Sequence, residues 1–351
     1  MTNPASSSSP PETDCLVVAS QSRQVNRLTG VQILATGSYA PENVVRNEKL
    51  TELGYDADWI VKRTGIQARC WATDDQATSD IAYEAVVRCL DNGNINISEI
   101  DLILLATITP DQPTPSTACH VQRMLGSDAP AMDIGAACAG FMYALITGMQ
   151  FVACGPYQRV LVIGADLMSR TVNPKDMKTF PLFGDGAGAV GIGPGTPDQG
   201  FHSYTLGADG NGAQLLHMPA GGTRCPTTPE SLIQELQYLT MDGRSVFKWA
   251  IRTLSDSVNQ VLDYAQIKPA DVDLTILHQA NNRIIQAAAT ELGLNKDDVF
   301  VNLDRYGNTS AASIPLALDE AYQAGLINPN DKVLFSGFGA GLSWGSGVWQ
   351  W

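Results

Sequence analysis

Three side chains are candidates for joint chemistry: the thiol of Cys138, the imidazole of His278 and the amide of Asn308. Cys138 follows a turn of small residues and is expected to open a helix. There the backbone N–H groups and the helix dipole favour a thiolate and lower the thiol pKa. The neighbouring glycine and alanine residues leave room for a substrate to approach the sulfur. A neutral imidazole and a side-chain amide can both donate hydrogen bonds beside such a nucleophile.

Each of these residue types also has a structural interpretation. Cysteines within apolar helical patterns are usually buried hydrophobic residues, and a lone histidine is usually structural. Asn308 taken alone would be a helix cap or turn residue. The structural interpretation is the one we give to the following residues: Cys89, Cys119, Cys154, His120, His202 and His217.

Two glycine-rich stretches are further candidates for a binding site. Residues 183–189 (FGDGAGA) lack the Gly-Lys-Ser/Thr ending of a phosphate-binding loop, so close packing at a turn is the better interpretation. Residues 338–345 (FGAGLSWG) follow the last expected strand. Their small side chains would allow a backbone N–H group to face a substrate carbonyl.

The elements that must position these residues alternate between strands and helices, which indicates an α/β protein. Buried strands are expected at residues 31–35, 101–109, 131–134 and 159–164. Helices are expected at residues 79–90, with Ser79 as the N-cap, at 117–125 and from Phe141 onward.

The chain also repeats its own pattern. Segments 98–104 and 269–277 are similar, and each follows an amphipathic helix, at 79–90 and 246–265. Each segment is followed at nearly the same distance by a small-residue turn, which holds Cys138 in the first copy and Asn308 in the second. We therefore expect two α/β halves, 29–200 and 201–351, with a Gly- and Pro-rich join near 195–230 that could cover a site. In such a fold equivalent strand ends converge, so Cys138, His278 and Asn308 should meet.

Composition limits the class of protein. The 351 residues are 44% hydrophobic and 17% charged, against about 25% charged in an average globular protein, which excludes a mostly disordered chain. The 22 basic and 36 acidic residues give a net charge of −14, which argues against a protein that coats nucleic acid. No apolar run reaches the ~20 residues of a membrane span. We therefore expect neither a nucleic-acid nor a membrane partner.

The seven cysteines are scattered and include no Cys-x-x-Cys pair. This argues against a disulfide framework or a structural zinc site, and indicates reduced thiols in the cytoplasm. Residues 1–28 contain a Ser/Pro run and an apolar stretch too short for a signal peptide. We interpret them as a disordered tail.

Six motifs together resemble the β-ketoacyl-[acyl-carrier-protein] synthase III family, the condensing enzymes that start fatty-acid synthesis within the thiolase-like superfamily. They follow the family order from about residue 30 to the C-terminus: WIVKRTGI (59–66), DIGAACAGF (133–141), FGDGAGA (183–189), HQAN (278–281), GNTS (307–310) and GFGAG (337–341). A Cys-His-Asn set is that of synthase III, whereas the elongating synthases use Cys-His-His. The resemblance implies a five-layered α/β/α/β/α fold built from two duplicated halves, and a homodimer.

The resemblance also implies a mechanism. Cys138 would take the acyl group from an acyl-CoA thioester. Malonyl-acyl-carrier-protein would then lose CO₂, and His278 and Asn308 would hold the resulting enolate oxygen. The enolate would attack the acyl group, whose oxyanion would be held by the backbone N–H groups of Cys138 and Ala340, a position that is often glycine in the family. No metal, flavin or nicotinamide cofactor is implied.

The family's binding positions can be carried over to this sequence. Trp59 and Arg170 would sandwich the adenine of CoA, and Arg63 and Arg283 would meet phosphates or the carrier protein. Lys248 and Arg252 lie one turn apart on an expected helix. With Arg283 they would form the basic patch that an acidic carrier protein needs, although an ordinary solvated surface is nearly as good an interpretation.

Thr114 departs from the family pattern, which often has an aromatic residue at this position. In the family that residue crosses the dimer interface and caps the acyl pocket. Because threonine is smaller, we hypothesise a deeper pocket that accepts primers longer or bulkier than acetyl.

Other functions remain open at this level. An acyltransferase or a secondary-metabolite synthase of the same superfamily would use the same Cys138 and His278. A non-catalytic scaffold that binds acyl-CoA or carrier protein is disfavoured by the presence of all three candidate residues. A Cys-His-Asn protease is disfavoured because it gives no role to the internal repeat or to the Trp59–Arg63 segment.

Overall fold

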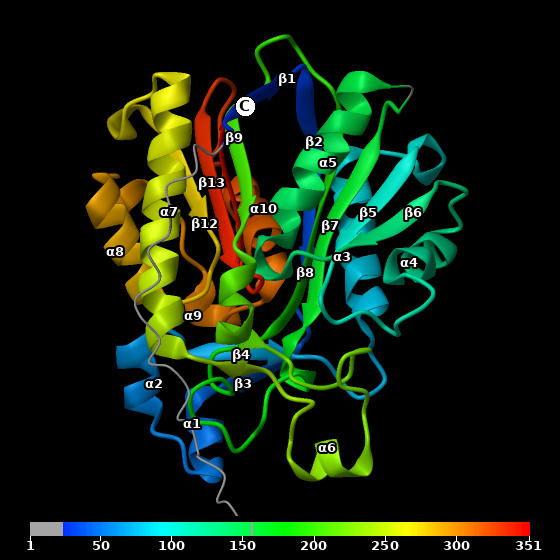
Figure 1. Ribbon diagram of the computed structural model, residues 1–351. Helices are drawn as coiled ribbons and strands as arrows, with labels where there is room; N and C mark the ends of the chain where they lie inside the picture. Colours follow the sequence, from blue (N-terminus) through cyan, green and yellow to red (C-terminus); the bar gives the residue numbers. More distant parts are fainter. Residues whose placement is uncertain (1–23, 156) are drawn as a thin grey trace, which may run out of the picture.

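Two five-stranded sheets form the centre of the protein (Figure 1). The computed structural model describes residues 24–155 and 157–351. The first sheet has the order β2-β8-β7-β5-β6, with bounds Val31–Tyr39, Asp185–Pro194, Val160–Leu167, Leu102–Ala106 and Ala131–Ile134. The second has the order β1-β9-β14-β13-β12, with bounds Asn26–Thr29, Gly200–Ala208, Ser343–Gln350, Lys332–Gly339 and Leu274–Leu277.

The two sheets share one topology. In the first, β5 is parallel to β6 and β7, and β7, β8 and β2 pair antiparallel in succession. In the second, β12 is parallel to β13, and β13, β14 and β9 pair antiparallel in succession. A parallel bridge between Thr275 and Val299 takes the place that β6 has beside β5. The halves are thus related in strand order as well as in sequence pattern.

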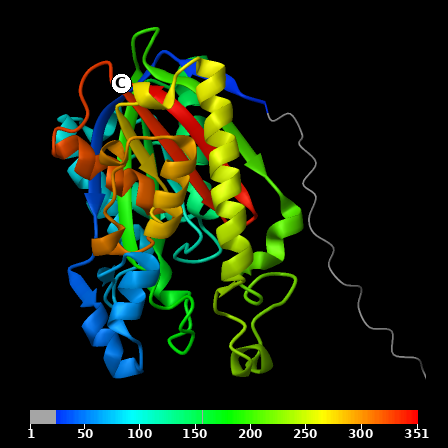
Figure 2. The ribbon, with the colours of Figure 1, turned by 90° about the vertical axis from the view of Figure 1, so that its left-hand side faces the viewer.

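Helices cover both faces of each sheet. Helices α5 (Gly140–Cys154) and α10 (Ser313–Gln323) lie between the sheets, in contact with both. Helices α3 (Thr78–Gly93) and α4 (Thr117–Leu125) cover the outer face of the first sheet. Helices α7 (Gly243–Ala265) and α8 (Asn282–Leu292) cover that of the second, where α7 runs along the sheet (Figure 2). The expected five-layered α/β/α/β/α fold is confirmed.

The central helix is apolar on all sides because sheets pack on both sides of it. Phe141, Met142, Leu145 and Met149 of α5 are fully buried in the core between the sheets. Within the described residues, the segment Ala137–Cys154 is the one helical stretch long and apolar enough to cross a membrane, and 61% of it is buried inside the protein. Burial between two sheets accounts for this composition.

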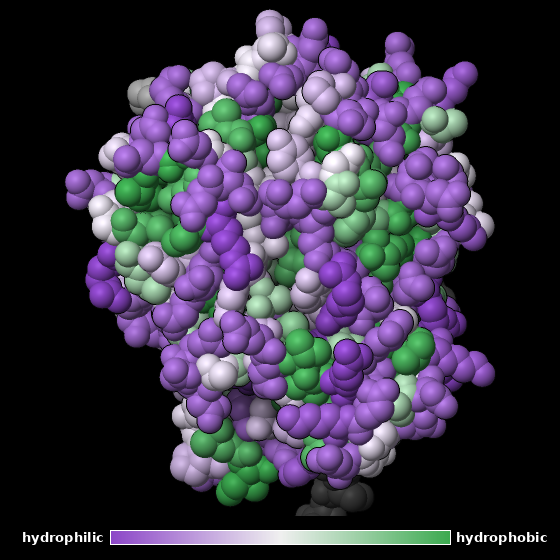
Figure 3. Space-filling view, turned by 180° about the vertical axis from the view of Figure 1, so that it is seen from behind, coloured by the Kyte–Doolittle hydropathy of each residue, from purple (hydrophilic) through white to green (hydrophobic). Residues whose placement is uncertain are grey.

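The remaining elements lie beyond the edges of the layers. They are the helices α1 (Asn47–Leu50), α2 (Ala57–Thr64), α6 (Pro229–Ile233) and α9 (Leu303–Tyr306), and the strand pairs β3–β4 (Asn43–Arg46, Ala68–Trp71) and β10–β11 (Leu216–His217, Thr240–Met241). Helix α6 forms a lobe in the join between the halves. Leu232 and Ile233 of this lobe are 48% and 81% exposed, and the space-filling view shows hydrophobic surface at this end of the molecule (Figure 3).

Several local expectations need correction. Helix α3 begins at Thr78, so Ser79 is not its N-cap; the Ser79 backbone N–H and hydroxyl instead bind the carboxylate of Asp111. The strand expected at 101–109 ends at Ala106. The next two residues leave the sheet because the Thr107 hydroxyl and the Ile108 backbone N–H donate hydrogen bonds to the carboxylate of Asp166. Cys119 and Cys154 are exposed, whereas Cys89 is buried as expected.

The predicted tail is also too long at its C-terminal end. Residues Asn26–Thr29 form β1, which pairs antiparallel with β9. Residues 1–23 of the predicted tail lie outside the described residues.

Candidate active site

Cys138 lies in the short 3₁₀ helix Ala137–Ala139, between β6 and α5. The preceding residue, Ala137, has a φ of 47°, a left-handed conformation that an L-residue adopts at a cost. The strand β13 approaches closely from the other half, since a Cβ atom at Gly339 would lie only 2.6 Å from the backbone nitrogen of Cys138. Glycine at 339 therefore allows the 339–341 loop to lie against the backbone of Cys138.

His278 follows β12, and its ring is buried. Its Nδ1 atom lies 2.6 Å from the hydroxyl oxygen of Ser313, at the start of α10. The ring of Phe338 packs edge-on to the imidazole, with centroids 5.2 Å apart. The contact fits either direction: a Ser313 hydroxyl that donates to Nδ1 leaves the proton of the neutral imidazole on Nε2, where it can donate to a substrate, whereas a hydroxyl that accepts from Nδ1–H leaves Nε2 as an acceptor.

Asn308 lies between α9 and α10 and is fixed by its neighbours. Its backbone N–H donates to the carbonyl of Leu182, and its carbonyl accepts from the N–H of Gly184. Its side-chain Oδ1 accepts a hydrogen bond of 2.9 Å from the backbone N–H of Ser310. Only the oxygen of a side-chain amide can accept a hydrogen bond from a backbone N–H. The orientation of the Asn308 amide is therefore determined, and its NH₂ group remains available as a donor.

The three residues line one cavity, with about 810 Å³ of empty space that is partly open to solvent. The cavity wall is mainly apolar, and it is built by α7, by the pair β10–β11 and by the segments around the three candidate residues. Its apolar lining includes Leu216, Leu239, Met241, Phe247, Trp249 and Phe338. Leu216 of β10 lies within the join expected near 195–230, so the join contributes to the cavity wall, whereas Leu239 and Met241 lie beyond it in the second half.

Burial sets the protonation states of the two titratable residues. It raises the pKa of the Cys138 thiol to about 12; the hydroxyl of Ser310 partly offsets this and the charge of Asp166 adds to it. The lowered thiol pKa expected for a helix start is therefore wrong for this structure, because desolvation outweighs the helix terminus. Burial also lowers the pKa of His278 to about 3, so its imidazole is neutral at physiological pH.

The residues expected to bind CoA separate into two groups. The guanidinium of Arg63 lies 5.8 Å from the centre of the Trp59 ring, and both side chains are exposed. Arg170 instead donates to the backbone carbonyls of Thr73 and Gln76, at 2.8 and 2.6 Å. The arginine beside Trp59 in this structure is thus Arg63, and adenine stacking by Arg170 stays a prediction.

The residues expected to dock a carrier protein lie near the cavity. Arg283 covers the ring of Phe247, a cavity residue, at 5.6 Å. Lys248 and Arg252 are exposed on α7, which packs against α8, the helix of Arg283. Arg252 also lies 3.8 Å from Asp256. Thr114 is exposed and is not among the residues that line the cavity.

Two residues near the site were missed by the sequence reasoning. Ser313 was not singled out, although a hydroxyl at a helix start can contact a nearby strand end. Asp166, at the end of β7, is fully buried and accepts hydrogen bonds from Thr107, Ile108, Thr109 and Ala311. The signal in the sequence that could have identified Asp166 is a lone aspartate at the end of an apolar strand.

Comparison with known proteins adds independent information. Family models match residues 132–210 (3-oxoacyl-[acyl-carrier-protein] synthase III) and 262–351 (the C-terminal part of the same family). A β-ketoacyl-[acyl-carrier-protein] synthase III of Rhodopirellula baltica is 55% identical over 345 residues, covering 93% of this chain and 100% of that protein. A synthase III of Caldanaerobacter subterraneus subsp. tengcongensis is 48% identical over 321 residues, covering 91% and 97%.

Among solved structures, the 3-oxoacyl-[acyl-carrier-protein] synthase III of Aquifex aeolicus has a TM-score of 0.85 and 40% identity, covering 92% of this chain and 100% of that one. The fold, the order of the motifs and these relatives agree. The chain therefore belongs to the β-ketoacyl-[acyl-carrier-protein] synthase III family, the enzymes that start fatty-acid synthesis by condensing acyl-CoA with malonyl-acyl-carrier-protein.

Proposed function

We propose that Cys138 is the nucleophile of this condensation and that His278 and Asn308 stabilise the enolate. The observation that carries the assignment is that the three side chains line one cavity, while the hydrogen bond from Ser310 leaves the NH₂ group of Asn308 as a donor. The contact of Ser313 with Nδ1 is compatible with a His278 proton on Nε2, and the proposed mechanism uses that tautomer. In the first half-reaction the sulfur of Cys138 bonds to the acyl carbon, the bond from that carbon to the CoA sulfur breaks, and the thiol proton ends on CoA.

In the second half-reaction the malonyl group loses CO₂, and the bonding electrons form an enolate. Nε2–H of His278 and the NH₂ group of Asn308 donate to the enolate oxygen, and the buried, neutral state of His278 suits a donor that does not titrate. The enolate carbon then attacks the acyl carbonyl, and Cys138 leaves as a thiolate that regains a proton. The product is β-ketoacyl-carrier-protein.

The oxyanion formed on the acyl carbonyl would be held by backbone N–H groups of Cys138 and Ala340. The close approach of Gly339 to the Cys138 nitrogen brings these two backbone segments together. A backbone donor does not depend on the side chain, so alanine at position 340 is compatible with this role.

The basic residues around the cavity form the proposed contact surface for the acidic substrates. Trp59, Arg63 and Arg170 would receive the nucleotide of CoA, and Arg283, Lys248 and Arg252 the carrier protein. Arg283 and Arg63 border the cavity through Phe247 and Asn281, respectively. For a chain of net charge −14 this concentration of cations provides a local site for an acidic partner.

A homodimer is the proposed assembly, and the cytoplasm the proposed location. Strand β6 is the last strand of its sheet, and Met132 on it is 40% exposed, so this edge can pair with a second copy. In such a dimer the exposed Thr114 would reach the partner's acyl pocket and leave it deeper than an aromatic residue would. The six cysteines of the described residues are all free thiols, which is typical of a reducing compartment.

The test is intact-protein mass spectrometry after mixing with acyl-CoAs of increasing chain length, with Cys138→Ser beside the wild type and Cys119→Ser as the control for an exposed thiol. A single acyl adduct that is absent only in Cys138→Ser supports the assignment, and a strong preference for acetyl would contradict the deeper pocket. Malonyl-carrier-protein should discharge the adduct as the β-ketoacyl product. Discharge without that product would indicate an acyltransferase, and no adduct would indicate a carrier-borne primer or a binding scaffold.

A further inference from the structure

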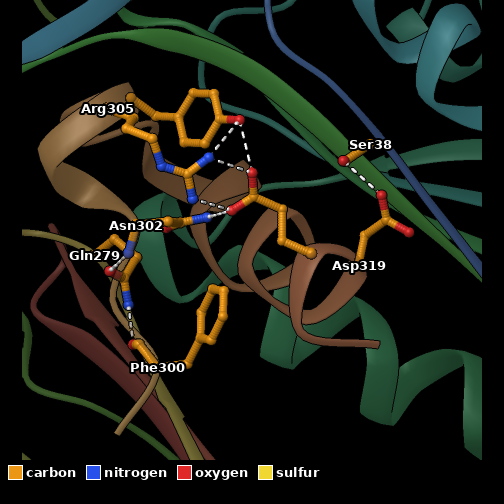
Figure 4. Close-up of polar contacts among 8 residues, drawn as sticks. Ser38, Gln279, Phe300, Asn302, Arg305 and Asp319 are labelled. Carbon is orange, nitrogen blue, oxygen red and sulfur yellow. Dashed lines mark hydrogen bonds and ion pairs between the residues drawn. The ribbon is translucent and has the colours of Figure 1, made fainter. Parts of the chain in front are cut away.

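A carboxylate behind the cavity binds the short helix that leads to Asn308. Glu320 lies on α10 and accepts two hydrogen bonds from the guanidinium of Arg305, Nη1 to Oε1 at 2.8 Å and Nη2 to Oε2 at 2.7 Å. The hydroxyl of Tyr306 donates to Oε1 at 2.7 Å, and the side-chain amide of Asn302 donates to Oε2 at 2.8 Å (Figure 4). All three donors belong to α9 or its N-cap position.

The same cluster extends to the segment that carries His278. The backbone N–H of Asn302 donates to the side-chain oxygen of Gln279 at 3.1 Å. The Gln279 amide in turn donates to the carbonyl of Leu277 at 2.7 Å and to that of Phe300 at 3.3 Å (Figure 4). Gln279 is the residue after His278, so one connected set of hydrogen bonds joins Glu320 to the chain beside both proposed enolate donors.

Helix α9 needs such support because it has only four residues. A single helical turn is not stable without tertiary contacts. Asn308 follows α9 after one glycine, Gly307, so a shift of α9 would move the Asn308 amide. Hydrogen bonds from Arg305, Asn302 and Tyr306 outweigh burial and lower the pKa of Glu320, which keeps the carboxylate ionised at neutral pH.

We propose that Glu320 is a positioning residue for the decarboxylation step, acting through α9 on Asn308 and through Asn302 and Gln279 on His278. The inference rests on the enolate-stabilising roles proposed above for those two residues. Cys138 is held mainly by other parts of the fold, the turn after β6 and the end of β13, although the hydroxyl of Ser310, two residues after Asn308, also acts on its thiol. Loss of Glu320 should therefore slow decarboxylation of the malonyl group much more than acylation of Cys138.

The direct test is Glu320→Gln, which keeps the size of the side chain. Its amide has one acceptor oxygen, and its NH₂ group would face the donors of Asn302 or Arg305. We expect CO₂ release from malonyl-carrier-protein to fall by up to about a hundredfold, as for a small misplacement of a reacting group. The rate of Cys138 acylation, followed by quenched-flow mass spectrometry, should change much less. Tyr306→Phe is a second variant in case Glu320→Gln folds poorly. It removes the hydroxyl that donates to Glu320 and accepts from Arg305 at 3.3 Å, but leaves the other donors to Glu320, so it should give a smaller loss in the same step.

Asp319 provides a matched control on the same helix. Its carboxylate is buried and accepts a hydrogen bond from Thr36 of β2 at 2.7 Å. It also accepts one from Ser38 of β2 at 2.6 Å, on the side away from α9 (Figure 4). Asp319→Asn should leave the ratio of the two partial rates at the wild-type value even where it lowers the melting temperature.

Three outcomes would overturn the proposal: equal slowing of both steps in Glu320→Gln, wild-type decarboxylation in both Glu320→Gln and Tyr306→Phe, or the same selective loss in Asp319→Asn. His278→Ala and Asn308→Ala are measured in parallel. Wild-type decarboxylation in those two variants would refute the roles proposed for His278 and Asn308 themselves, which separates that failure from a failure of Glu320 to position them.

Discussion

Replacing Ser313 by alanine should slow decarboxylation by removing the hydroxyl that, in the proposed mechanism, keeps the proton of His278 on Nε2. The hydroxyl of Ser313 lies 2.6 Å from Nδ1 of His278, and the two residues are 2% and 1% exposed. Water therefore has little access to replace the lost hydrogen bond. In Ser313→Ala the proton of the neutral imidazole is free to reside on Nδ1, and the fraction of enzyme with an Nε2–H donor decreases.

The size of the effect follows from the burial of this contact. Removing one partner of a buried hydrogen bond costs about 1–3 kcal/mol. If that cost appears in the transition state, the rate falls by about 5- to 160-fold, since about 1.4 kcal/mol corresponds to a factor of ten. Acylation of Cys138 should change much less, because in the proposed mechanism the donor at Nε2 acts on the enolate.

The assay compares CO₂ release from malonyl-carrier-protein with the rate of Cys138 acylation. ¹⁵N NMR of histidine-labelled protein reports the tautomer directly, and the chain has only four histidines. Ser346→Ala is the control, because Ser346 is fully buried and its hydroxyl bonds to Ser257 and Ser336, at 2.8 and 2.7 Å, and not to His278. The reasoning fails if Ser313→Ala decarboxylates at the wild-type rate, or if Ser346→Ala is slowed to the same extent.

Three further predictions concern charge. Asp166→Asn should lower the pKa of Cys138 from about 12, so that iodoacetamide alkylates the thiol faster than in the wild type at any pH from 7 to 10; an unchanged pH–rate profile would contradict an effect of Asp166. His278 has a pKa of about 3 in the folded protein and about 6.5 when unfolded. Its contribution to the free energy of unfolding is therefore present above pH 6.5 and decreases as the pH falls toward 3, and urea titrations at several pH values should show a weaker decrease in His278→Asn. Arg283→Glu should raise the KM for malonyl-carrier-protein several-fold at low salt and leave kcat unchanged, and the difference should shrink at high salt; a salt-independent effect would point away from electrostatic docking.

Local patterns predicted several elements because their causes are local. The expected strand at 131–134 and helix at 117–125 match β6 and α4 residue for residue. In both segments the signals that predict the element, the apolar spacing and the turn residues on either side, lie within or directly next to the element in the sequence. The meeting of Cys138, His278 and Asn308 at one cavity was also predictable, because a duplicated α/β unit brings equivalent strand ends together.

Expectations failed where a distant partner decides the outcome. Ser79 has the side chain of an N-cap, but the carboxylate of Asp111 binds it inside the first turn of α3. The guanidinium of Arg170 binds carbonyls of the segment that precedes α3, a contact that the sequence did not predict, while its role toward CoA stays a prediction. Cys119 lies in a helix whose apolar face is buried, but on its exposed side. Sequence spacing does not identify such partners, because they come from segments far away along the chain.

The pKa of the Cys138 thiol is a further property that local sequence does not predict. A helix start predicts a lowered thiol pKa, and the sequence does place a helix directly after Cys138. The opposite shift arises because the second half closes over the sulfur and because β7 brings the buried carboxylate of Asp166 near it. The first half alone thus supplies a helix terminus that favours the thiolate, and the packing of the complete fold opposes it. The thiol of Cys138 is therefore neutral at physiological pH, and in the proposed mechanism it loses its proton during the acylation step instead of before it.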